Sequence, residues 1–153
     1  MIDVFISYKR DDRDDARAIA ETLVADGYEV WWDILLLPGD RFRDEIVTVL
    51  EEAKAVVVLW SKEALKSDFV VDEAQLANKL GKYLPMSLDG SMPPIGLRNV
   101  NCPLLVQWRI NKAQSELKGL RDAIRGRVGE PRTNQALLHK TSTRKWRRLF
   151  GKP

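Results

Sequence analysis

The chain has 153 residues, 44% of them hydrophobic and 31% charged, which is typical of one folded globular domain and not of a disordered chain. The net charge of +3 is unevenly spread: residues 1–110 carry 13 Lys/Arg against 19 Asp/Glu, a net of −6, and residues 111–153 carry 12 against 3, a net of +9. Because Cys102 is the only cysteine and His139 the only histidine, an intramolecular disulfide, a Cys/His zinc cluster and a Ser–His–Asp triad in the first 110 residues are all excluded.

The first part of the chain predicts two strands separated by a helix. Ile2–Tyr8 is β-branched and aromatic, as in a buried strand, and a charged loop follows it. Apolar residues from Ala16 to Val24 recur at helical spacing, and Asp26-Gly27 ends this helix. Tyr28–Trp32 predicts a second strand, in which at least one of the two tryptophans belongs to the core.

The middle of the chain repeats the alternation of helix and strand. A loop with Pro38-Gly39 precedes an apolar periodicity from Phe42 to Ala53 that predicts a helix. Ala55–Trp60 is almost wholly apolar, as expected for a central parallel strand that is covered on both faces. A helical region from Ser61 to about Leu80 comes next, and Tyr83–Leu88 predicts a fourth strand.

The last predicted elements are a fifth strand over Pro103–Trp108 and a final amphipathic helix within residues 111–127. Alternating strands and helices with short connections predict an α/β fold of the flavodoxin-like kind, an open five-stranded parallel sheet with helices on both faces. Ligands of such sheets bind beyond the carboxyl ends of the strands. We expect this domain to span residues 1–127 and a basic C-terminal tail to span 128–153.

Two families with this kind of sheet are excluded by missing residues. A phosphoacceptor receiver needs an aspartate at the end of the central strand, where this chain has Leu59-Trp60-Ser61. A dinucleotide site or P-loop needs a glycine-rich turn after the first strand, where this chain has SYKRDD. The N-terminus does not have the pattern of a signal peptide and no apolar run approaches the roughly 18 residues of a membrane span, so a cytoplasmic location is expected.

Four segments at the predicted carboxyl edge resemble the Toll/interleukin-1 receptor (TIR) domain, prokaryotic members above all. They are FISYKRDD, VWWD followed by LLPGDRFRDEI, VVLWSKEALKSDFVVDEAQLA, and YLPMSLDGSMPPIGLR. The resemblance covers about residues 1–110 in the order and spacing of the family. It implies a five-stranded parallel sheet, which agrees with the periodicity.

The resemblance also implies an activity, because many TIR domains cleave the nicotinamide–ribose bond of NAD⁺. Their catalytic glutamate lies in a pattern that here runs from Ser67 to Glu73, with Phe69 where the enzymatic members commonly carry tryptophan. Phe69 and Glu73 are four residues apart, so one helix face presents a ring beside a carboxylate. A carboxylate stabilises the positive charge that develops on ribose, and no metal or other cofactor is required. The alternative interpretation of Glu73 is a solvated helix carboxylate.

Three further residues are candidates for substrate binding. Tyr8 and Arg10 follow the first strand, where TIR enzymes are similarly equipped, and Arg10 suits a pyrophosphate. The alternative for Arg10 is a surface ion pair with a nearby aspartate. Asp33 is a candidate for orienting ribose hydroxyls, and its alternative is a loop or helix cap.

The segment after Asp33 resembles the BB loop of TIR domains, which is linked to substrate access and to contacts between TIR domains. Leu35, Leu36, Leu37, Pro38 and Gly39 form its apolar part. If exposed, this run favours homotypic TIR–TIR assembly, and if folded inward it belongs to the core.

Three interpretations of the basic tail remain open. Arg144, Lys145, Arg147 and Arg148 surround Trp146 in TSTRKWRRLFGKP. The tail is a surface anchor for anionic lipid, a ligand of nucleic acid or an acidic protein, or a terminus with no partner beyond the acidic domain.

The sequence therefore supports two hypotheses of function. The first is a TIR-type NAD⁺ glycohydrolase that releases nicotinamide and ADP-ribose or a cyclic form of it, activated by self-association, with a sensor protein as a possible partner, in prokaryotic immune signalling. The second is a non-catalytic TIR interaction module that acts as a signalling adaptor. Glu73, Phe69 and the region of Arg10 discriminate between them.

Overall fold

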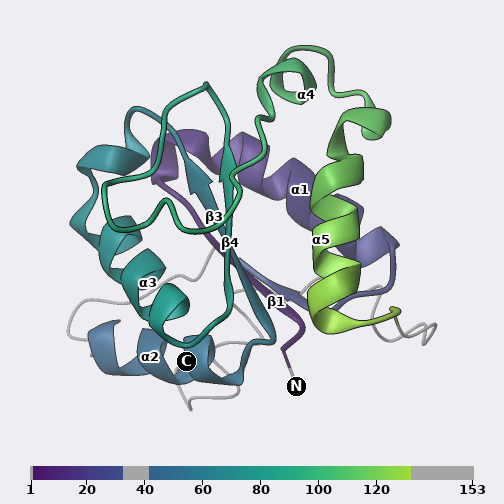
Figure 1. Ribbon diagram of the computed structural model, residues 1–153. Helices are drawn as coiled ribbons and strands as arrows, with labels where there is room; N and C mark the ends of the chain where they lie inside the picture. Colours follow the sequence, from purple (N-terminus) through teal and green to yellow (C-terminus); the bar gives the residue numbers. More distant parts are fainter. Residues whose placement is uncertain (1, 33–41, 132–153) are drawn as a thin grey trace.

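The computed structural model describes residues 2–32 and 42–131 of the chain (Figure 1). Its centre is a four-stranded parallel sheet in the order β2-β1-β3-β4. The strands are β1 (Val4–Ser7), β2 (Val30–Trp31), β3 (Ala55–Trp60) and β4 (Tyr83–Ser87). The chain crosses from β1 to β2, then back past β1 to β3, so the order of strands changes direction between β1 and β3. Ligand sites of open α/β sheets form at such a point.

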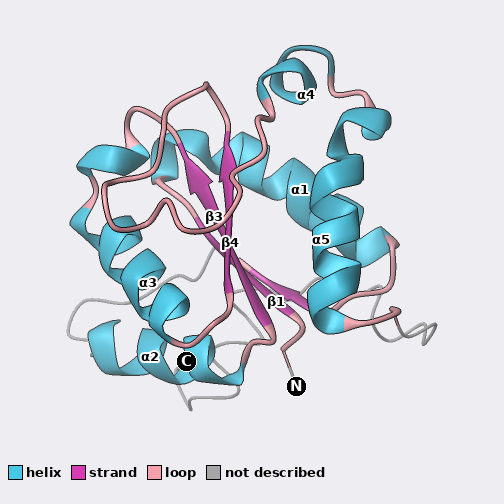
Figure 2. Cartoon of the chain, viewed as in Figure 1, coloured by secondary structure: helices cyan, strands magenta, loops and turns pink. Residues whose placement is uncertain are grey.

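Helices cover both faces of the sheet, as the sequence predicts. Figures 1 and 2 show α1 and α5 on one side of the strands and α2 and α3 on the other. The α-helices are α1 (Arg13–Ala25), α2 (Phe42–Glu52), α3 (Asp68–Lys79), α4 (Val106–Asn111) and α5 (Lys118–Val128). Short 3-10 helices precede α1, α3 and α5: η1 (Arg10–Asp12), η2 (Ala64–Lys66) and η3 (Gln114–Leu117).

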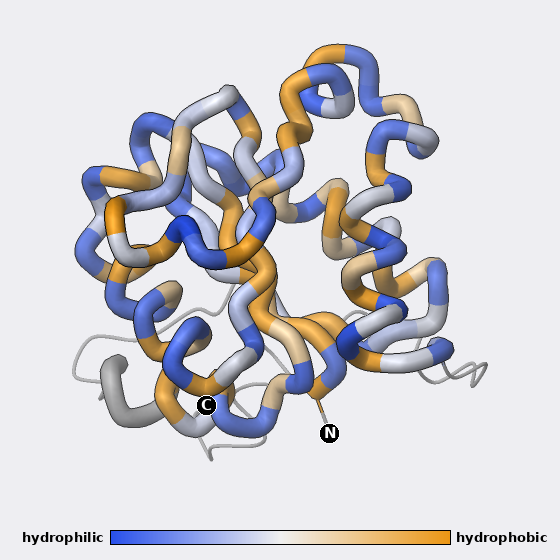
Figure 3. The backbone as a smooth tube through the Cα atoms, viewed as in Figure 1, coloured by the Kyte–Doolittle hydropathy of each residue, from blue (hydrophilic) through white to orange (hydrophobic). Residues whose placement is uncertain are grey.

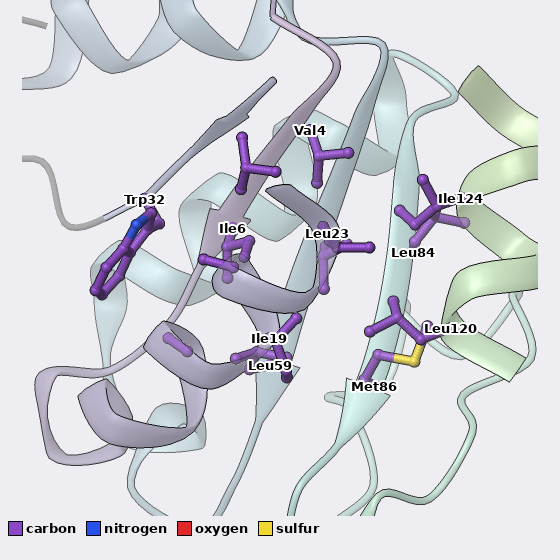
Figure 4. Close-up of a cluster of buried hydrophobic side chains, with 14 of the residues drawn as sticks. Val4, Ile6, Ile19, Leu23, Trp32, Leu59, Leu84, Met86, Leu120 and Ile124 are labelled. Carbon is purple, nitrogen blue, oxygen red and sulfur yellow. The ribbon is translucent and has the colours of Figure 1, made fainter. Parts of the chain in front are cut away.

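The central strand β3 divides the hydrophobic interior into two cores. Ala55, Val57 and Leu59 pack with α1 and α5 in what we call the α1-side core (Figure 4). The residues between them, Val56, Val58 and Trp60, pack with α2 and α3 in the α3-side core. All six residues of β3 are buried, and Figure 3 shows hydrophobic segments running through the centre of the tube, where the strands lie. The apolar segment Ala55–Trp60 is thus buried on both faces of the sheet, as the sequence predicts.

The predicted fifth strand over Pro103–Trp108 is wrong. One parallel bridge, between Ser87 and Leu104, is all that forms: Ser87 N–H donates to Pro103 O (2.9 Å) and Leu105 N–H donates to Ser87 O (2.7 Å). The chain then turns into α4, whose Trp108 is buried in the α1-side core. Burial of this ring favours a helical turn over continued pairing, so the sheet has four strands and not five.

The tryptophan expectation is confirmed, and the final helix differs in detail. The two tryptophans of the second strand are both buried, Trp31 in the α3-side core and Trp32 in the α1-side core, because neighbouring residues of a strand face opposite ways. The final helix α5 extends to Val128 and ends at Gly129, whose φ of 100° is one that glycine tolerates. Within the described residues, no helix is long and apolar enough to cross a membrane.

Ile19→Ala in α1 is expected to lower the free energy of unfolding by about 2–5 kcal/mol, because it leaves a cavity under the sheet. Ile19 is 0% exposed, whereas Ile110 in α4 is 72% exposed. Ile110→Ala makes the same change in a helix and is expected to cost less than about 0.5 kcal/mol. Urea unfolding of both variants measures the difference, and equal losses would contradict the burial of Ile19.

Candidate active site

The candidate catalytic residue Glu73 lies on the second turn of α3, where it meets the carboxyl end of β1. Ser67 caps the helix, its Oγ accepting a hydrogen bond from Val70 N–H (3.3 Å). Val70, Ala74 and Ala77 are buried against the sheet, and this fixes the rotation of the helix. Glu73 precedes Ala74 and is half-buried. The helix therefore aims the Glu73 carboxylate at the edge of the sheet and not at open solvent.

The Glu73 carboxylate has a partner on β1. Ser7 Oγ donates to Glu73 Oε1 over 2.5 Å, across 66 positions of sequence. Ser7 is the last residue of β1 and is 1% exposed. A hydrogen bond to an ionised acceptor is among the stronger ones, so the carboxylate is held and not freely rotating.

A pocket opens beside this carboxylate, between α2 and α3. Its volume is about 170 Å³, which matches a single aromatic ring more than a whole dinucleotide. Most of its wall is apolar, and its lining residues are Ile46, Val47, Leu50, Phe69, Asp72, Glu73 and Leu76. Phe69 is 55% exposed, so much of its ring is accessible. Phe69 and Glu73, four residues apart on α3, both line this pocket.

The surroundings of Glu73 change its acidity. The pKa of Glu73 is raised to about 7: burial raises it most, the Ser7 hydrogen bond lowers it, and the charge of Asp72 raises it further. A carboxylate with this pKa is about half ionised at neutral pH. Glu73 is therefore not the solvated helix carboxylate of the alternative interpretation.

Tyr8 and Arg10 lie at the carboxyl end of β1 but do not line the pocket. Tyr8 packs against the α1-side core, and its ring centroid is 6.2 Å from that of Trp32. Arg13 lies over the same Trp32 ring at 5.4 Å. Arg10 begins η1 and is exposed, and no ion pair of Arg10 is found with another described residue. The surface ion pair considered for Arg10 does not form within the described part of the chain.

The remaining candidates lie outside the described residues. These are Asp33 and the BB-loop-like segment Leu35, Leu36, Leu37, Pro38 and Gly39. Most of the basic tail, residues 132–153, lies outside them as well. Their roles stay predictions.

A second polar cluster fixes the loop after β1 to the end of β3 and to α4. Asp12 is 4% exposed and accepts from Ser61 Oγ (2.5 Å) and from Arg109 Nη2 (3.0 Å). Arg109 Nε also donates to Asp15 Oδ2 (2.9 Å), and Lys112 Nζ donates to the other oxygen of the same carboxylate, Asp15 Oδ1 (2.9 Å). Burial raises the pKa of Asp12, while the Ser61 bond and the Arg109 charge lower it. This cluster holds η1 in place and is distinct from the Glu73 pocket.

Sequence reasoning missed Ser7 and the apolar wall of the pocket. The position of Ser7 was one available signal, because it is a polar residue that ends a buried strand at the edge where ligands bind. The wall residues Ile46, Leu50 and Leu76 carry ordinary helical periodicity, which does not distinguish core from pocket. Among the described residues, no group of three or more His, Cys, Asp or Glu side chains could hold a metal ion.

The chain is similar in sequence to known proteins. The model of the family described as "TIR domain" matches residues 4–124. The chain is 38% identical over 69 residues to the 2′ cyclic ADP-D-ribose synthase AbTIR of Acinetobacter baumannii, covering 44% of this chain and 26% of that protein. It is 37% identical over 68 residues to the uncharacterized protein y4cD of Sinorhizobium fredii, covering 43% of this chain and 11% of that protein. The chain thus spans about a quarter or less of the length of these relatives.

Two solved structures share the fold. The TIR domain of the Toll-related receptor TRR-2 from Hydra magnipapillata superposes with a TM-score of 0.66 at 19% identity, over 82% of this chain and 99% of that one. The TIR domains of the activated Roq1 resistosome, which recognises the pathogen effector XopQ, superpose with a TM-score of 0.50 at 18% identity, over 94% and 89%. At these identities the likeness concerns the fold.

Glu73→Gln is expected to stabilise the protein at alkaline pH. The folded-state pKa of Glu73 is raised to about 7, so the folded state binds the proton more tightly than the unfolded state does. The carboxylate therefore destabilises the fold above pH 7, and this effect disappears as the pH falls towards 4.5. The variant is expected to gain up to about 3 kcal/mol at pH 8 and almost nothing at pH 4.5.

Urea unfolding of both proteins between pH 4.5 and 8.5 measures this gain. Glu63→Gln is the control, because the Glu63 side chain is 45% exposed and, among the described residues, pairs with Lys66 at 3.4 Å; its gain at pH 8 is expected to be smaller than that of Glu73→Gln. Equal stability of the wild type and Glu73→Gln at pH 8 would contradict the environment described for Glu73.

Proposed function

The chain belongs to the TIR domain family, and on that basis we propose that it cleaves the nicotinamide–ribose bond of NAD⁺, with Glu73 as the catalytic carboxylate. The observation that carries the proposal is the juxtaposition of a held carboxylate and an exposed ring in one apolar pocket of ring size. The name of the Acinetobacter relative, a cyclic ADP-ribose synthase, supports the same chemistry.

The pocket suits the leaving group of this reaction. Nicotinamide in NAD⁺ is a flat cation, and Phe69 offers a face on which it stacks, while Ile46 and Leu50 line the opposite wall. As the C1′–N1 bond breaks, its electron pair goes to the ring nitrogen and nicotinamide leaves as a neutral molecule. An apolar pocket favours this neutral product over the cation in the substrate.

Glu73 acts on the other side of the same bond. Loss of nicotinamide leaves an oxocarbenium-like ribose, and an ionised carboxylate beside it stabilises the developing positive charge. Water then attacks C1′ and loses a proton to give ADP-ribose, or a hydroxyl of the same molecule attacks to give a cyclic form. Neither step requires a metal ion.

We assign the rest of the dinucleotide to the carboxyl edge outside the pocket. The pocket of about 170 Å³ holds one ring, so ribose, pyrophosphate and adenine must lie beyond it. Arg10 is the candidate for the pyrophosphate, since it is exposed at the start of η1. Tyr8 and Asp33 remain candidates for the ribose. We expected the domain to end at residue 127, but α5 runs to Val128, so we propose that the domain reaches the end of this helix and that the basic tail after it lies outside this chemistry.

Self-association is part of the proposal. The Roq1 TIR domains were solved within an activated assembly, and Leu35–Gly39 is the segment we expect to mediate contact between copies. The activity is therefore expected to rise when the protein is clustered. A sensor protein that drives the clustering, in prokaryotic immunity, completes the hypothesis.

Clustered wild-type protein is expected to release nicotinamide from NAD⁺, and Glu73→Gln is expected to lower kcat by a factor on the order of 10²–10³, as when one electrostatic transition-state contact is removed. Chromatography of nicotinamide and ADP-ribose products measures both. Glu63→Gln, the same change at a half-buried residue that does not line the pocket, is expected to keep full activity. If clustered wild-type protein releases no nicotinamide, the protein is instead the non-catalytic interaction module.

Phe69→Ala is expected to lower kcat/KM roughly tenfold to hundredfold, because the stacking face for the nicotinamide ring is removed. Phe69→Trp is expected to match or exceed the wild type, since the larger ring offers more area. Ile95→Ala serves as the control, because it removes an apolar side chain that is 88% exposed in the loop after β4. Initial rates at several NAD⁺ concentrations give kcat/KM for each variant. An unchanged kcat/KM in Phe69→Ala would show that the Phe69 ring does not bind the substrate.

A further inference from the structure

We propose that Ser7 is the positioning residue of this site: its hydroxyl fixes the Glu73 carboxylate against the end of β1 and selects its ionised form. The inference rests on the proposed function for its effect on turnover. Its structural content, a hydroxyl that controls one carboxylate, stands independently. Ser7 does not line the pocket, so it is expected to act through Glu73 and not on the substrate.

The strand gives Ser7 a fixed direction. Phe5 of β1 packs in the α3-side core, whereas Ile6 and Tyr8 pack with the α1-side core. Side chains of a strand alternate, so Ser7 shares the face of Phe5 and points towards α3. A hydroxyl at residue 6 or 8 would point away from Glu73.

The backbone of Ser7 is also held. Ser7 pairs with Val58 of the fully buried strand β3, and its side chain is almost completely shielded from water. A hydroxyl in this position has no competing solvent partner. Its bond to Glu73 Oε1, at 2.5 Å, therefore restrains the carboxylate without a further loss of freedom in the strand.

The bond also opposes the other influences on the charge of Glu73. The pocket wall of Ile46, Leu50 and Leu76 is apolar, and burial favours the protonated acid. Asp72 is the other ionisable side chain among the described residues that line the pocket, and its negative charge acts in the same direction. The Ser7 hydrogen bond lowers the pKa of Glu73, so its removal shifts the equilibrium towards the inactive protonated form.

The first experiment is the pH profile of kcat/KM, which reports ionisation in the free enzyme. In Ser7→Ala the midpoint of the acid limb, where activity rises as Glu73 ionises, is expected to move up by about one pH unit. This shift corresponds to the usual free energy of one hydrogen bond to a carboxylate. The loss of activity is then roughly tenfold on the acid limb, below the pKa, and smaller at pH 9. Ser7→Thr keeps the hydroxyl and is expected to restore the wild-type profile.

The matched control is Ser87→Ala. Ser87 also ends a buried strand and is 0% exposed, but its hydroxyl bonds Ser91 O (2.7 Å) and Gly90 N–H (3.0 Å) and not Glu73. It is expected to lower stability without moving the acid limb. A shift of equal size in Ser87→Ala would show that the effect is a general loosening of the sheet edge, and would overturn the proposal.

The second experiment does not depend on turnover. The chemical shift of ¹³C-labelled glutamate carboxyls is followed against pH, with Glu73→Gln assigning the Glu73 signal. Its midpoint is expected to rise in Ser7→Ala. If the midpoint rises but no variant cleaves NAD⁺, the proposed function fails and the role of Ser7 stands. If wild type cleaves NAD⁺ and the midpoint does not move, the role of Ser7 is wrong.

Folding of the variants is checked by thermal melting. If Ser7→Ala does not fold, Ser7→Cys keeps nearly the same volume with a much weaker donor. It is expected to raise the midpoint in the same direction by a smaller amount. An unchanged midpoint in folded Ser7→Cys, with Ser7→Thr also unchanged, would equally overturn the proposal.

Discussion

The burial of β3 on both faces of the sheet is the constraint on which the rest of the structure depends. A strand of six buried residues must satisfy its backbone through neighbours on both edges, and β1 and β4 supply them in parallel register. Two parallel neighbours are joined by a crossover connection, usually an α-helix, that returns the chain to the start of the next strand. One face of β3 packs against α1 and α5, and the other face packs against α2 and α3. Parallel pairing also brings the carboxyl ends of all strands to one edge, where Ser7 and Ser61 lie.

Two buried serines at this edge, Ser61 and Ser7, each donate a hydrogen bond to a carboxylate from another element. Ser61 donates to Asp12, and Arg109 of α4 completes that cluster. Ser7 donates to Glu73 in the same way. The two pairs differ in what surrounds them within the described residues: Asp12 has a cationic partner in Arg109, whereas Glu73 has the Ser7 hydroxyl, the neighbouring Asp72 and an apolar wall. Burial of a carboxylate in such surroundings costs stability, and a substrate that brings a positive charge relieves that cost.

Ser7 connects these two observations under the proposed function. The nicotinamide ring of NAD⁺ carries a positive charge, and the ribose acquires positive charge as the bond breaks. The hydrogen bond from Ser7 favours the ionised form of Glu73, which is the form that stabilises this developing charge. The serine at the end of β1 thus combines a structural task, closing the strand, with control of the ionisation on which the proposed chemistry depends.

The sequence by itself determined the α/β alternation, the central strand at Ala55–Trp60 and the side-by-side placement of Phe69 and Glu73, because each follows from local periodicity within one element. The tertiary structure alone decided what depends on contacts between distant segments. Burial of Trp108 replaced a fifth strand with α4, and the pairing of β1 with β3 placed Ser7 against a glutamate 66 positions away. The same packing set the acidity of Glu73 and drew Tyr8 towards Trp32, since neither is visible in the spacing of residues along one helix or strand.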